Sequence, residues 1–536
     1  MSYAEATAAD IYNRLSGDRE SFIRAAEESA ELTIPSLFPR EGKAHGQEFR
    51  RPRNWVGPRG VNHISARILM SLLPAGSQFV RMVPDGAALE ILEQDQEARA
   101  EVEEALAGIE REVQKSVASG TLRVVAVDAI KQLVVAGNVL TYSPDDSDAE
   151  ELVAYPLSNF VVDRDLDDNL LVVVLCQEVD PDTLDEETRA FAQDNPADMG
   201  SFGAGVLKSG KSVRIYTKIW REGRMFKVQQ EIGGKVIPGT EGVYPPSKLP
   251  YRVHRWEKVD NEAYGRGLVE QYYGTLNDVE ILETALVEGA IAASRVIPLV
   301  SPTGVTDPQD VNRQKNGEAI SGEEGDIVFL QMQKYADFRV AKEQLDEKNR
   351  ALSSVFLLNF ARDAERVTAE EIRMFAQELE STHSGVFLRL AAEFQLPIVS
   401  RIIDRLQKDK VIPELSDKLR EHIKPTPLTG VDALARGQDL ERIHAVFNAS
   451  RTVIGPDTLA QYANPGTILQ FMLTAAGLDI PGAVKSDAEV QAIRQQQQQA
   501  AMSQQMLGGA VPQLAKGAVE NPAVAQGIAD AVNQGQ

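Results

Sequence analysis

Four aspartates, Asp163, Asp165, Asp167 and Asp168, are the closest approach to a metal-binding motif in the sequence. Alternating carboxylates supply the oxygen ligands that calcium prefers, but a calcium loop of the EF-hand type also needs a central glycine and a closing glutamate. Neither residue is present at the required place. We therefore interpret the aspartates as an acidic turn between two strands and predict no metal site.

The motifs of common enzyme classes are also missing. The sequence has no glycine-rich phosphate loop ending in Lys-Ser or Lys-Thr, no H-E-x-x-H zinc motif and no G-x-S-x-G elbow. Gly265-Arg266-Gly267 lacks the third glycine and the preceding strand of a dinucleotide-binding turn. The six histidines are widely separated. We therefore predict no enzyme activity, no cofactor and no metal.

Charge restricts the class of nucleic-acid protein that the sequence can encode. The chain has 56 basic and 79 acidic residues and a formal net charge of -23. Tight non-specific DNA binders carry basic surfaces, so this balance argues against that class. It permits a conduit through which DNA slides without sticking. An acidic surface that serves only solubility explains the charge equally well.

Cysteine content and hydropathy indicate where the chain folds. Cys176 is the only cysteine, so an intramolecular disulfide is impossible and folding in a reducing cytoplasm is expected. The apolar runs are short, such as Leu170 to Cys176, whereas a membrane span needs about 20 apolar residues. We predict no secretory signal and no membrane segment.

Hydrophobic periodicity divides the first 260 residues into a helical part and a β part. Helices are predicted at 12–32, 64–73, 87–117 and 122–135, with a loop at 40–60 and a helix C-cap at Gly137-Asn138. Two strands within 153–177 flank a turn at 165–169, and 213–220 and 225–231 form a hairpin. The acidic stretch 180–210 between them is predicted to be a surface insertion.

The rest of the chain is mainly helical. Helices are predicted at 268–294 and 341–358, and they flank a Pro/Gly-rich piece with strands at 296–300 and 327–330. A capping box at Thr368 and Glu371 opens one long helix that runs to Leu406 and is kinked at Pro397. Such a helix is hard to bury in one small domain and hints at oligomerisation. The pattern therefore predicts an α+β, predominantly helical protein.

Several stretches resemble the portal proteins of podoviruses, the short-tailed bacteriophages. They occur in the same order from about residue 10 to about residue 450 and comprise Thr33 to Pro39, Lys131 to Tyr142, Tyr264-Gly265-Arg266, Ala336 to Phe338, Val340 to Lys342, Glu365 to Arg373, Glu393 to Pro397 and Arg436 to Leu440. None is a catalytic signature. Their order and spread make chance an unsatisfactory explanation.

The resemblance implies a portal-type subunit with a wing, a two-helix stem, a clip and a C-terminal helical crown. Transferred to this sequence, the parts are the wing at 1–260, stem helix 1 at 261–295, the clip at 296–335, stem helix 2 at 336–358, a tunnel loop at 359–367, a long kinked helix and return to the wing at 368–429, the crown at 430–500 and a flexible Gln/Ala-rich tail at 501–536.

The resemblance also implies partners and candidate site residues. Portal proteins form rings, usually of twelve subunits, at one capsid vertex of the virion, and they assemble in the host cytoplasm with the major capsid and scaffolding proteins. A terminase motor and later a tail adaptor protein dock on the clip, and double-stranded DNA passes through the channel with weak, non-specific contact. The DNA-facing candidates lie in the tunnel loop: Asn359, Arg362, Asp363 and Arg366.

Alternatives stay open for both the loop and the function. Arg362 and Arg366 either contact DNA phosphates or pair with Asp363, Glu365 or a neighbouring subunit. The clip either docks the motor and tail or pairs strands between subunits. Another phage head–tail adaptor or structural protein is the alternative function. An unrecognised enzyme and a sequence-specific DNA binder are further alternatives, although no basic recognition helix is visible.

Overall fold

The computed structural model describes residues 3–427 except 40–47, 75–78, 87–95, 120, 145–151, 196–198, 201–211, 295–296, 314, 316–317, 320, 324, 331–334, 359–373, 375–377, 380, 382–384 and 413–422. The chain divides into two units, Met1–Ala433 and Leu434–Gln536. The second unit, and with it the whole of the predicted crown and tail, lies outside the described residues.

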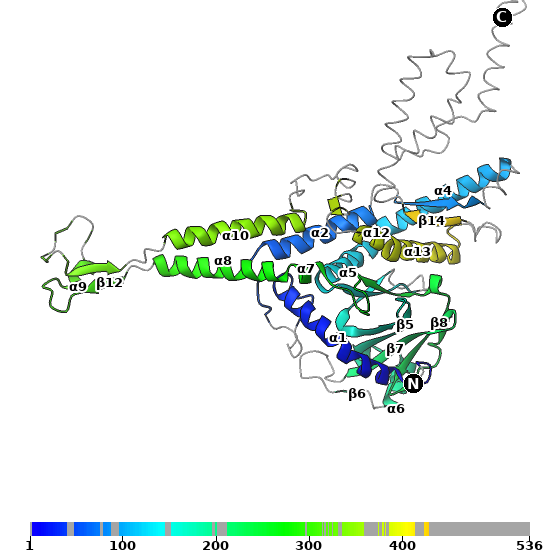
Figure 1. The fold of residues 1–536 in the computed structure, drawn as a ribbon. Coiled ribbons are helices and arrows are strands. Elements are labelled where there is room, and N and C mark those ends of the chain that lie inside the picture. The colour runs from blue at the N-terminus through cyan, green and yellow to red at the C-terminus, as the bar shows by residue number, and fades with distance from the viewer. Residues whose placement is uncertain are drawn as a thin grey trace, which may run out of the picture. The chain divides into compact units, whose positions relative to one another are not determined.

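Four helices dominate the first part of the chain, as the periodicity predicts: α1 (Ala8–Glu31), α2 (Val56–Leu72), α4 (Gln96–Ser119) and α5 (Leu122–Ala136) (Figure 1). Helix α1 begins with Thr7, whose hydroxyl oxygen accepts a hydrogen bond from the Asp10 amide. Helix α5 ends at Gly137, whose left-handed φ of 73° confirms the predicted C-cap.

The predicted loop at 40–60 is wrong in its last five residues, because α2 already begins at Val56. Proline is tolerated in the first helical turn, where amides have no partner within the helix, so Pro58 does not prevent this start. A Cβ on Gly57 would lie 2.5 Å from the carbonyl oxygen of Leu32, and one on Gly60 would lie 2.4 Å from the Phe356 ring. These glycines allow close packing of a helix and do not mark a loop.

A large antiparallel sheet forms the β part, with β10 (Gly242–Tyr244), β8 (Met225–Ile232), β7 (Ser212–Glu222), β5 (Leu170–Val179) and β4 (Phe160–Arg164) in spatial order. The predicted hairpin and the predicted turn between β4 and β5 are both confirmed. Strands β6 (Met199–Gly200) and β9 (Lys235–Val236) pair with β7 and β8, and helix α6 (Glu186–Asp194) lies within the predicted insertion.

Helix α1 packs on this sheet through an apolar cluster and a buried ion pair. Ile11 and Leu15 meet Val161, Val172 and Val174 from the strands. Lys218 and Glu231 form an ion pair, 3.3 Å apart and almost fully buried. Both bind backbone groups at the start of α1: the ammonium donates to the Ala6 carbonyl, and the carboxylate accepts from the Ala8 amide. Because both charges are also hydrogen-bonded, their burial is compensated.

Two smaller sheets connect distant parts of the sequence. Strands β11 (Tyr251–Arg255), β2 (Asn138–Tyr142) and β3 (Val153–Pro156) form one, and β1 (Val80–Pro84) pairs with β14 (Ile423–Pro427) in the other. Short 3₁₀ turns lie at Leu157–Asn159, Pro181–Thr183 and Pro246–Lys248. The main hydrophobic core is shared by α2, α5 and the later helices α12 (Val386–Leu390) and α13 (Leu396–Lys408).

The predicted helix at 268–294 is present but interrupted. It consists of α7 (Leu268–Gln271) and α8 (Tyr273–Ser294), separated at Tyr272. The second predicted helix is α10 (Tyr335–Val355), and the segment between contains β12 (Ile297–Val300), α9 (Pro308–Arg313) and β13 (Ile327–Leu330). Both predicted strand pieces are thus confirmed, and they pair antiparallel.

The single long helix from Thr368 to Leu406 is wrong. Gly385 adopts a left-handed conformation with φ of 84°, which an α-helix cannot contain, and a new helix α12 (Val386–Leu390) begins after it. A π-helical turn at Ala391–Gln395 then leads into α13 (Leu396–Lys408). The distortion lies directly before Pro397, where the sequence predicts a kink. The predicted capping box lies outside the described residues.

Candidate functional site

Helices α8 and α10 lie side by side and form what we call the helical pair (Figure 1). Gly289 of α8 faces Phe338 of α10 so closely that a Cβ would lie 2.3 Å from the ring. Lys348 of α10 donates to Asp278 of α8 at 2.8 Å. The two helices therefore contact each other at Gly289, toward the end of α8, and at Asp278, near its start. We call the end of the pair near the start of α8 its base.

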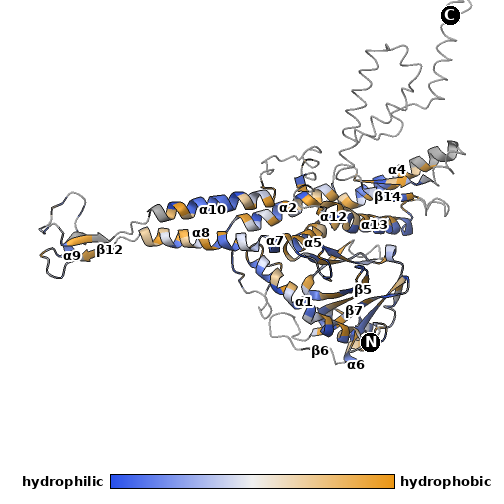
Figure 2. Ribbon diagram, in the orientation of Figure 1, coloured by the Kyte–Doolittle hydropathy of each residue, from blue (hydrophilic) through white to orange (hydrophobic). Residues whose placement is uncertain are grey.

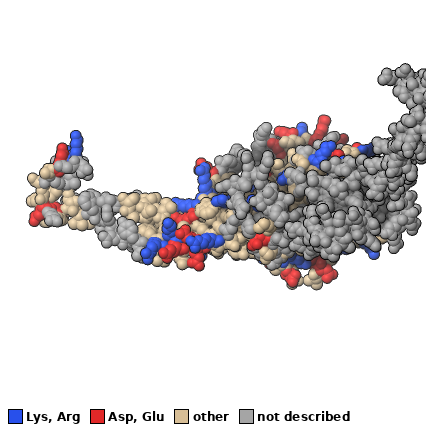
Figure 3. Space-filling view, turned by 90° about the horizontal axis from the view of Figure 1, so that it is seen from above, with Lys and Arg blue, Asp and Glu red and all other residues tan. Residues whose placement is uncertain are grey.

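The helical pair exposes apolar and charged side chains on different helices. Ile281, Val287 and Ile291 of α8 are 56%, 48% and 53% exposed. Helix α10 instead carries charges of both signs, such as Arg339 and Glu343, whose side chains are 80% and 71% exposed. Figure 2 shows α8 as the more hydrophobic helix, and Figure 3 shows acidic and basic side chains intermixed over the pair.

The base of the helical pair is fixed by a buried carboxylate. Glu280 of α8 accepts hydrogen bonds from the Arg53 amide at 2.9 Å, the Asn54 amide at 2.9 Å and the Asn54 side-chain amide at 3.0 Å. Burial alone would raise the pKa of Glu280, but these hydrogen bonds outweigh it and hold the pKa below its usual value. Glu280 thus ties α8 to the segment that leads into α2.

Strands β12 and β13 and the residues between them form a small unit that we call the tip. Its centre is Asp326, whose carboxylate accepts from the Val305 amide at 2.9 Å, the Thr306 amide at 3.0 Å and the Thr306 hydroxyl at 2.8 Å. The hydrogen bond from the Thr306 hydroxyl is the main reason why the pKa of Asp326 is lowered. Gly304 and Gly322 pack against these two side chains with no room for a Cβ.

The tip exposes apolar side chains around this polar centre. Leu299 and Val328 are directly opposite each other in the β12–β13 register and are 49% and 55% exposed. Val305 is 78% exposed. A sheet of two strands is marginally stable by itself, and within the described part of the chain no third strand pairs with either of its edges. The tip therefore presents both apolar and backbone surface to a partner.

The aspartates at 163–168 form a turn, as predicted. Asp165 accepts from the Asn169 amide at 2.7 Å, and Asp168 has a left-handed φ of 65°. The Asp168 carboxylate lies beside Arg164, Arg255 and Lys258. Among the described residues no group of three or more His, Cys, Asp or Glu side chains is placed to hold a metal ion.

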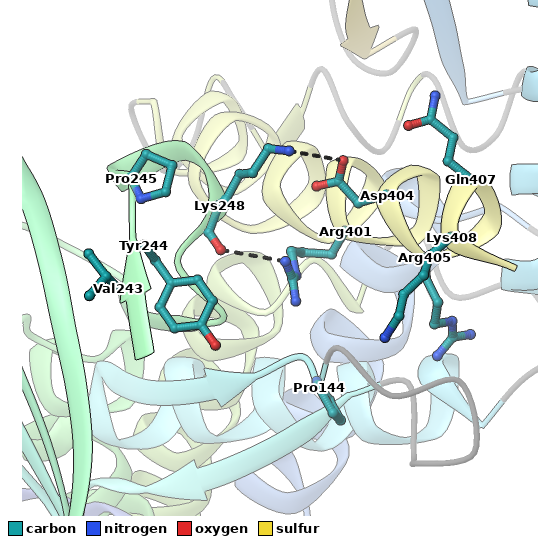
Figure 4. A pocket seen from close by; sticks show the side chains of 10 residues that line it. All are labelled: Pro144, Val243, Tyr244, Pro245, Lys248, Arg401, Asp404, Arg405, Gln407 and Lys408. Carbon is teal, nitrogen blue, oxygen red and sulfur yellow. Dashed lines mark hydrogen bonds and ion pairs between the residues drawn. The ribbon is translucent and has the colours of Figure 1, made fainter. Parts of the chain in front are cut away.

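A polar pocket of about 460 Å³ lies beside α13 (Figure 4). Lys248 pairs with Asp404 at 3.7 Å there, and Arg401 donates to the Lys248 carbonyl at 3.5 Å. The described lining, made of Pro144, Val243, Tyr244, Pro245, Lys248, Arg401, Asp404, Arg405, Gln407 and Lys408, includes no histidine, cysteine or serine. It offers no assembled nucleophile and base. Its residues come from three separate segments, so sequence spacing could not predict it.

Comparisons with known proteins identify the family to which the chain belongs. A family model described as bacteriophage head to tail connecting protein matches residues 5–481. The portal protein of Escherichia phage T7 is 34% identical over 509 residues, covering 94% of this chain and 92% of that protein. The portal protein of Enterobacteria phage T3 is 34% identical over 490 residues, covering 90% and 89%. The chain belongs to the family of bacteriophage head to tail connecting proteins.

Membership of the connector family confirms the function predicted from the sequence, that of a portal or head-to-tail connector, and not the alternative of a different adaptor. The portal protein of Enterobacteria phage SP6 is similar too, with 28% identity over 511 residues and coverage of 94% and 95%. A solved structure described as the neck of an empty GTA particle has a TM-score of 0.38 at 13% identity, covering 75% of this chain and 90% of that one. A score this low does not establish a shared arrangement of parts.

The predicted DNA-facing residues of the connector cannot be placed. Asn359, Arg362, Asp363 and Arg366 all lie outside the described residues, and the nearest described residue before them is Leu358. The structure instead brings together features that the sequence reasoning missed, namely the Glu280 hydrogen bonds and the Asp326 centre of the tip. The only sequence signals for these two features were a glutamate, Glu280, within an amphipathic helical pattern, and the residues Thr306 and Asp326 within the Pro/Gly-rich piece. No described helix is long and apolar enough to span a membrane.

Proposed function

We propose that this connector forms a ring of about twelve subunits at one capsid vertex, through which the genome is packaged, retained and ejected. The colinear match to the connector family over residues 5–481 is the observation that carries this proposal. The absence of a phosphate-loop motif fits a conduit that leaves ATP hydrolysis to a separate terminase motor. The described residues also present no assembled catalytic group.

We assign the proposed parts of the subunit to segments of the chain. The helical pair is the stem, and the tip between its helices is the clip. Residues 1–260 and 368–429 supply the wing, 359–367 the tunnel loop, 430–500 the crown and 501–536 the tail. An antiparallel pair of helices joined by a compact β piece supports the stem and clip assignments.

Ring formation is supported by the exposed face of α8. Ile281 and Ile291 are more than half exposed on a helix whose other side is already covered by α10. Apolar surface of this kind is unusual on a monomer and typical of a subunit contact. The exposed strand edges of the tip provide a second surface for a neighbouring subunit or for a docked partner.

The proposed partners act at different parts of the ring. The tip would dock the terminase motor and then a tail adaptor protein, and the wing would contact the major capsid and scaffolding proteins. Double-stranded DNA would pass with weak, non-specific contact, partly through Arg362 and Arg366. Replacing both arginines with alanine is expected to leave the ring assembled but to change DNA packaging or retention. A normal genome content in virions with both changes would contradict this role.

The mass of the purified full-length protein tests the proposed ring directly. One subunit is 58.7 kDa, so a ring of about twelve would weigh about 700 kDa. We expect native mass spectrometry and negative-stain images to show a ring near that mass with a central hole. A ring with a neighbouring number of subunits would still support the proposal. A stable, folded monomer or dimer at all salt concentrations would refute it.

A further inference from the structure

One stretch of this acidic protein has the opposite charge. Between Phe49 and Pro84 the sequence contains six arginines and neither aspartate nor glutamate, whereas the whole chain has a net charge of -23. Five of the six arginines lie within 18 residues, from Arg50 to Arg67. A local excess of one charge attracts a partner of the opposite charge. We call Arg50, Arg51, Arg53, Arg59 and Arg67 the arginine segment.

The first part of the arginine segment is held in one conformation. Glu280 fixes its backbone by accepting from the amides of Arg53 and Asn54. The Asn54 side chain also donates to the Leu32 carbonyl at 3.1 Å and accepts from the Gly57 amide at 2.9 Å, which caps the start of α2. Arg51 and Arg53 are nevertheless exposed. Because the backbone is already ordered, binding through these guanidinium groups costs side-chain entropy but no further backbone entropy.

The second part follows one face of α2. Arg59 lies with its guanidinium 5.5 Å from the centre of the Trp55 ring, and Trp55 is 49% exposed. Burial is the main reason why the pKa of His63 is lowered, and the nearby charges of Arg67 and Arg59 lower it further. Arg59 and Arg67 are each four residues from His63, so the three side chains share one face of α2. The Nδ1 atom of His63 is 3.3 Å from the Phe356 carbonyl oxygen, so this face borders the end of α10.

The guanidinium groups of the arginine segment have few internal partners. Among the described residues Arg51, Arg53, Arg59 and Arg67 form no ion pair, and Arg50 lies 3.6 Å from Glu280. The segment contains only arginine and no lysine. The planar fork of arginine matches two phosphate oxygens. The same fork also matches a carboxylate, so contact with the acidic surface of a neighbouring subunit is the competing outcome of the test.

We infer that the arginine segment is a contact surface for the phosphates of double-stranded DNA. The inference rests on the proposed function, because a DNA conduit brings duplex DNA to the subunit. His63, on the face of α2 that carries Arg59 and Arg67, lies against Phe356, which is three residues before the proposed tunnel loop in the sequence. In a strongly acidic protein a small number of such contacts would grip DNA without preventing its movement.

The test compares two full-length variants that lose the same charge. In the first, Arg51, Arg53, Arg59 and Arg67 are replaced by glutamine. In the second, the control, four basic residues of the large sheet and its turns are replaced by glutamine: the exposed Arg221, Arg224 and Lys235 and the half-buried Lys227. The readout is the affinity for a short fluorescent DNA duplex, measured by anisotropy between about 50 and about 200 mM salt. Ring mass is measured on the same samples.

We expect the first variant to bind DNA at least about tenfold more weakly at the lowest salt, and the control to bind as the unchanged protein does. The slope of log affinity against log salt should become shallower by about 0.9 for each lost phosphate contact. Replacing the same four residues with lysine should restore most of that slope, since the charge returns. Equal DNA binding by both variants, or no measurable binding by the unchanged ring, would overturn the inference while leaving the ring proposal intact. Loss of the ring only in the first variant would assign the segment to subunit contact and would also overturn it.

Discussion

Helices α8 and α10 pack against each other but differ in composition. The 22 residues of α8 include four charged residues, all acidic, and the last of them is Glu288. The 21 residues of α10 include eight charged residues of both signs. Helix α8 exposes Ile281, Val287 and Ile291, whereas the described side chains of α10 include one large exposed apolar residue, Val340.

This difference separates two roles that a helix on a protein surface can have. A charged helix is stable in water through its solvated face and its i,i+4 pairs, such as Arg339 with Glu343. An apolar face lowers the free energy only when another surface covers it. In a connector ring, α8 would therefore face a neighbouring subunit, and α10 would face water or the DNA channel.

The largest expected effect is on assembly. Changing Ile281→Asp and Ile291→Asp places two carboxylates in the proposed subunit contact, where burial of an unpaired charge is strongly unfavourable. We expect native mass spectrometry to show subunits of 58.7 kDa in place of the ring. Circular dichroism should stay unchanged, because both side chains are exposed in the single subunit.

The matched control adds the same two charges to the other helix. Gln344→Asp and Ala351→Asp lie at exposed positions of α10, and we expect this variant to keep its ring. If both double variants assemble, the exposed face of α8 is not a subunit contact. If both fall apart, charge alone rather than the apolar face decides assembly. Either result would remove the distinction between the two helices.

The next effect concerns the contact between α8 and α10. Gly289→Val would place a Cβ 2.3 Å from the Phe338 ring, so either the ring leaves its position between the helices or the helices separate. Overpacking of this kind costs about 1–3 kcal/mol. Hydrogen exchange should accelerate in α8 and α10 and not in the sheet. Gly274→Val is the control within α8, because no atom lies within 4 Å of its Cβ position. Equal protection from hydrogen exchange in the Gly289→Val and Gly274→Val variants would contradict close packing at Gly289.

Other glycines of the chain illustrate what the sequence could and could not predict. The helix itself follows from periodic apolar residues, and the sequence predicts it within a few residues. Whether a glycine marks a loop or a close contact depends on the neighbouring element, which is distant in sequence. Gly57 and Gly60 were interpreted as loop residues, yet they lie in α2 against Leu32 and Phe356. Gly385 was interpreted as part of a helix and instead separates two.

The motifs that carry the resemblance identified the family, but they did not explain why those residues occur at those positions. Tyr264-Gly265-Arg266 is a packing motif: Asn138 donates to the Gly265 carbonyl at 2.8 Å and accepts from its amide at 2.7 Å. A Cβ on Gly137 would lie 2.5 Å from the Arg266 backbone. The pairing of β1 with β14 joins residues more than 300 positions apart, so no local pattern predicts it. The hydrogen bonds of Glu280 with the Arg53 and Asn54 amides are non-local in the same way, because more than 200 positions separate the partners.

The third effect concerns the attachment of α8 at its base. Glu280→Gln keeps the size of the side chain but replaces an acceptor oxygen with a donor facing the Arg53 and Asn54 amides. We expect a loss of about 1–3 kcal/mol at neutral pH, measured by urea unfolding. The folded-state pKa of Glu280 is lowered, so its contribution is present above the usual value of 4.5 and is lost as the pH falls below it. The difference in unfolding free energy between the wild type and Glu280→Gln should therefore become smaller as the pH falls.

Glu288→Gln is the control for this change, since it removes a charge from the same helix. We expect it to have an effect within about 0.5 kcal/mol at every pH. A gap between wild type and Glu280→Gln that widens on acidification would mean that the carboxylate is not stabilised by its hydrogen bonds.

The smallest effect tests the one ion pair that joins the described parts of the two helices. Lys348 and Asp278 are 2.8 Å apart, but their side chains are 31% and 52% exposed. Solvent weakens such pairs, so Lys348→Ala should cost no more than about 1 kcal/mol, and the cost should fall as salt is added. Lys342→Ala, at an exposed position of α10 without an ion pair to a described residue, is the control. A loss for Lys348→Ala that persists at high salt would mean that the lysine stem packs against α8. The helical pair would then be held partly by apolar contacts of α10, and the division between an apolar and a charged helix would be less sharp.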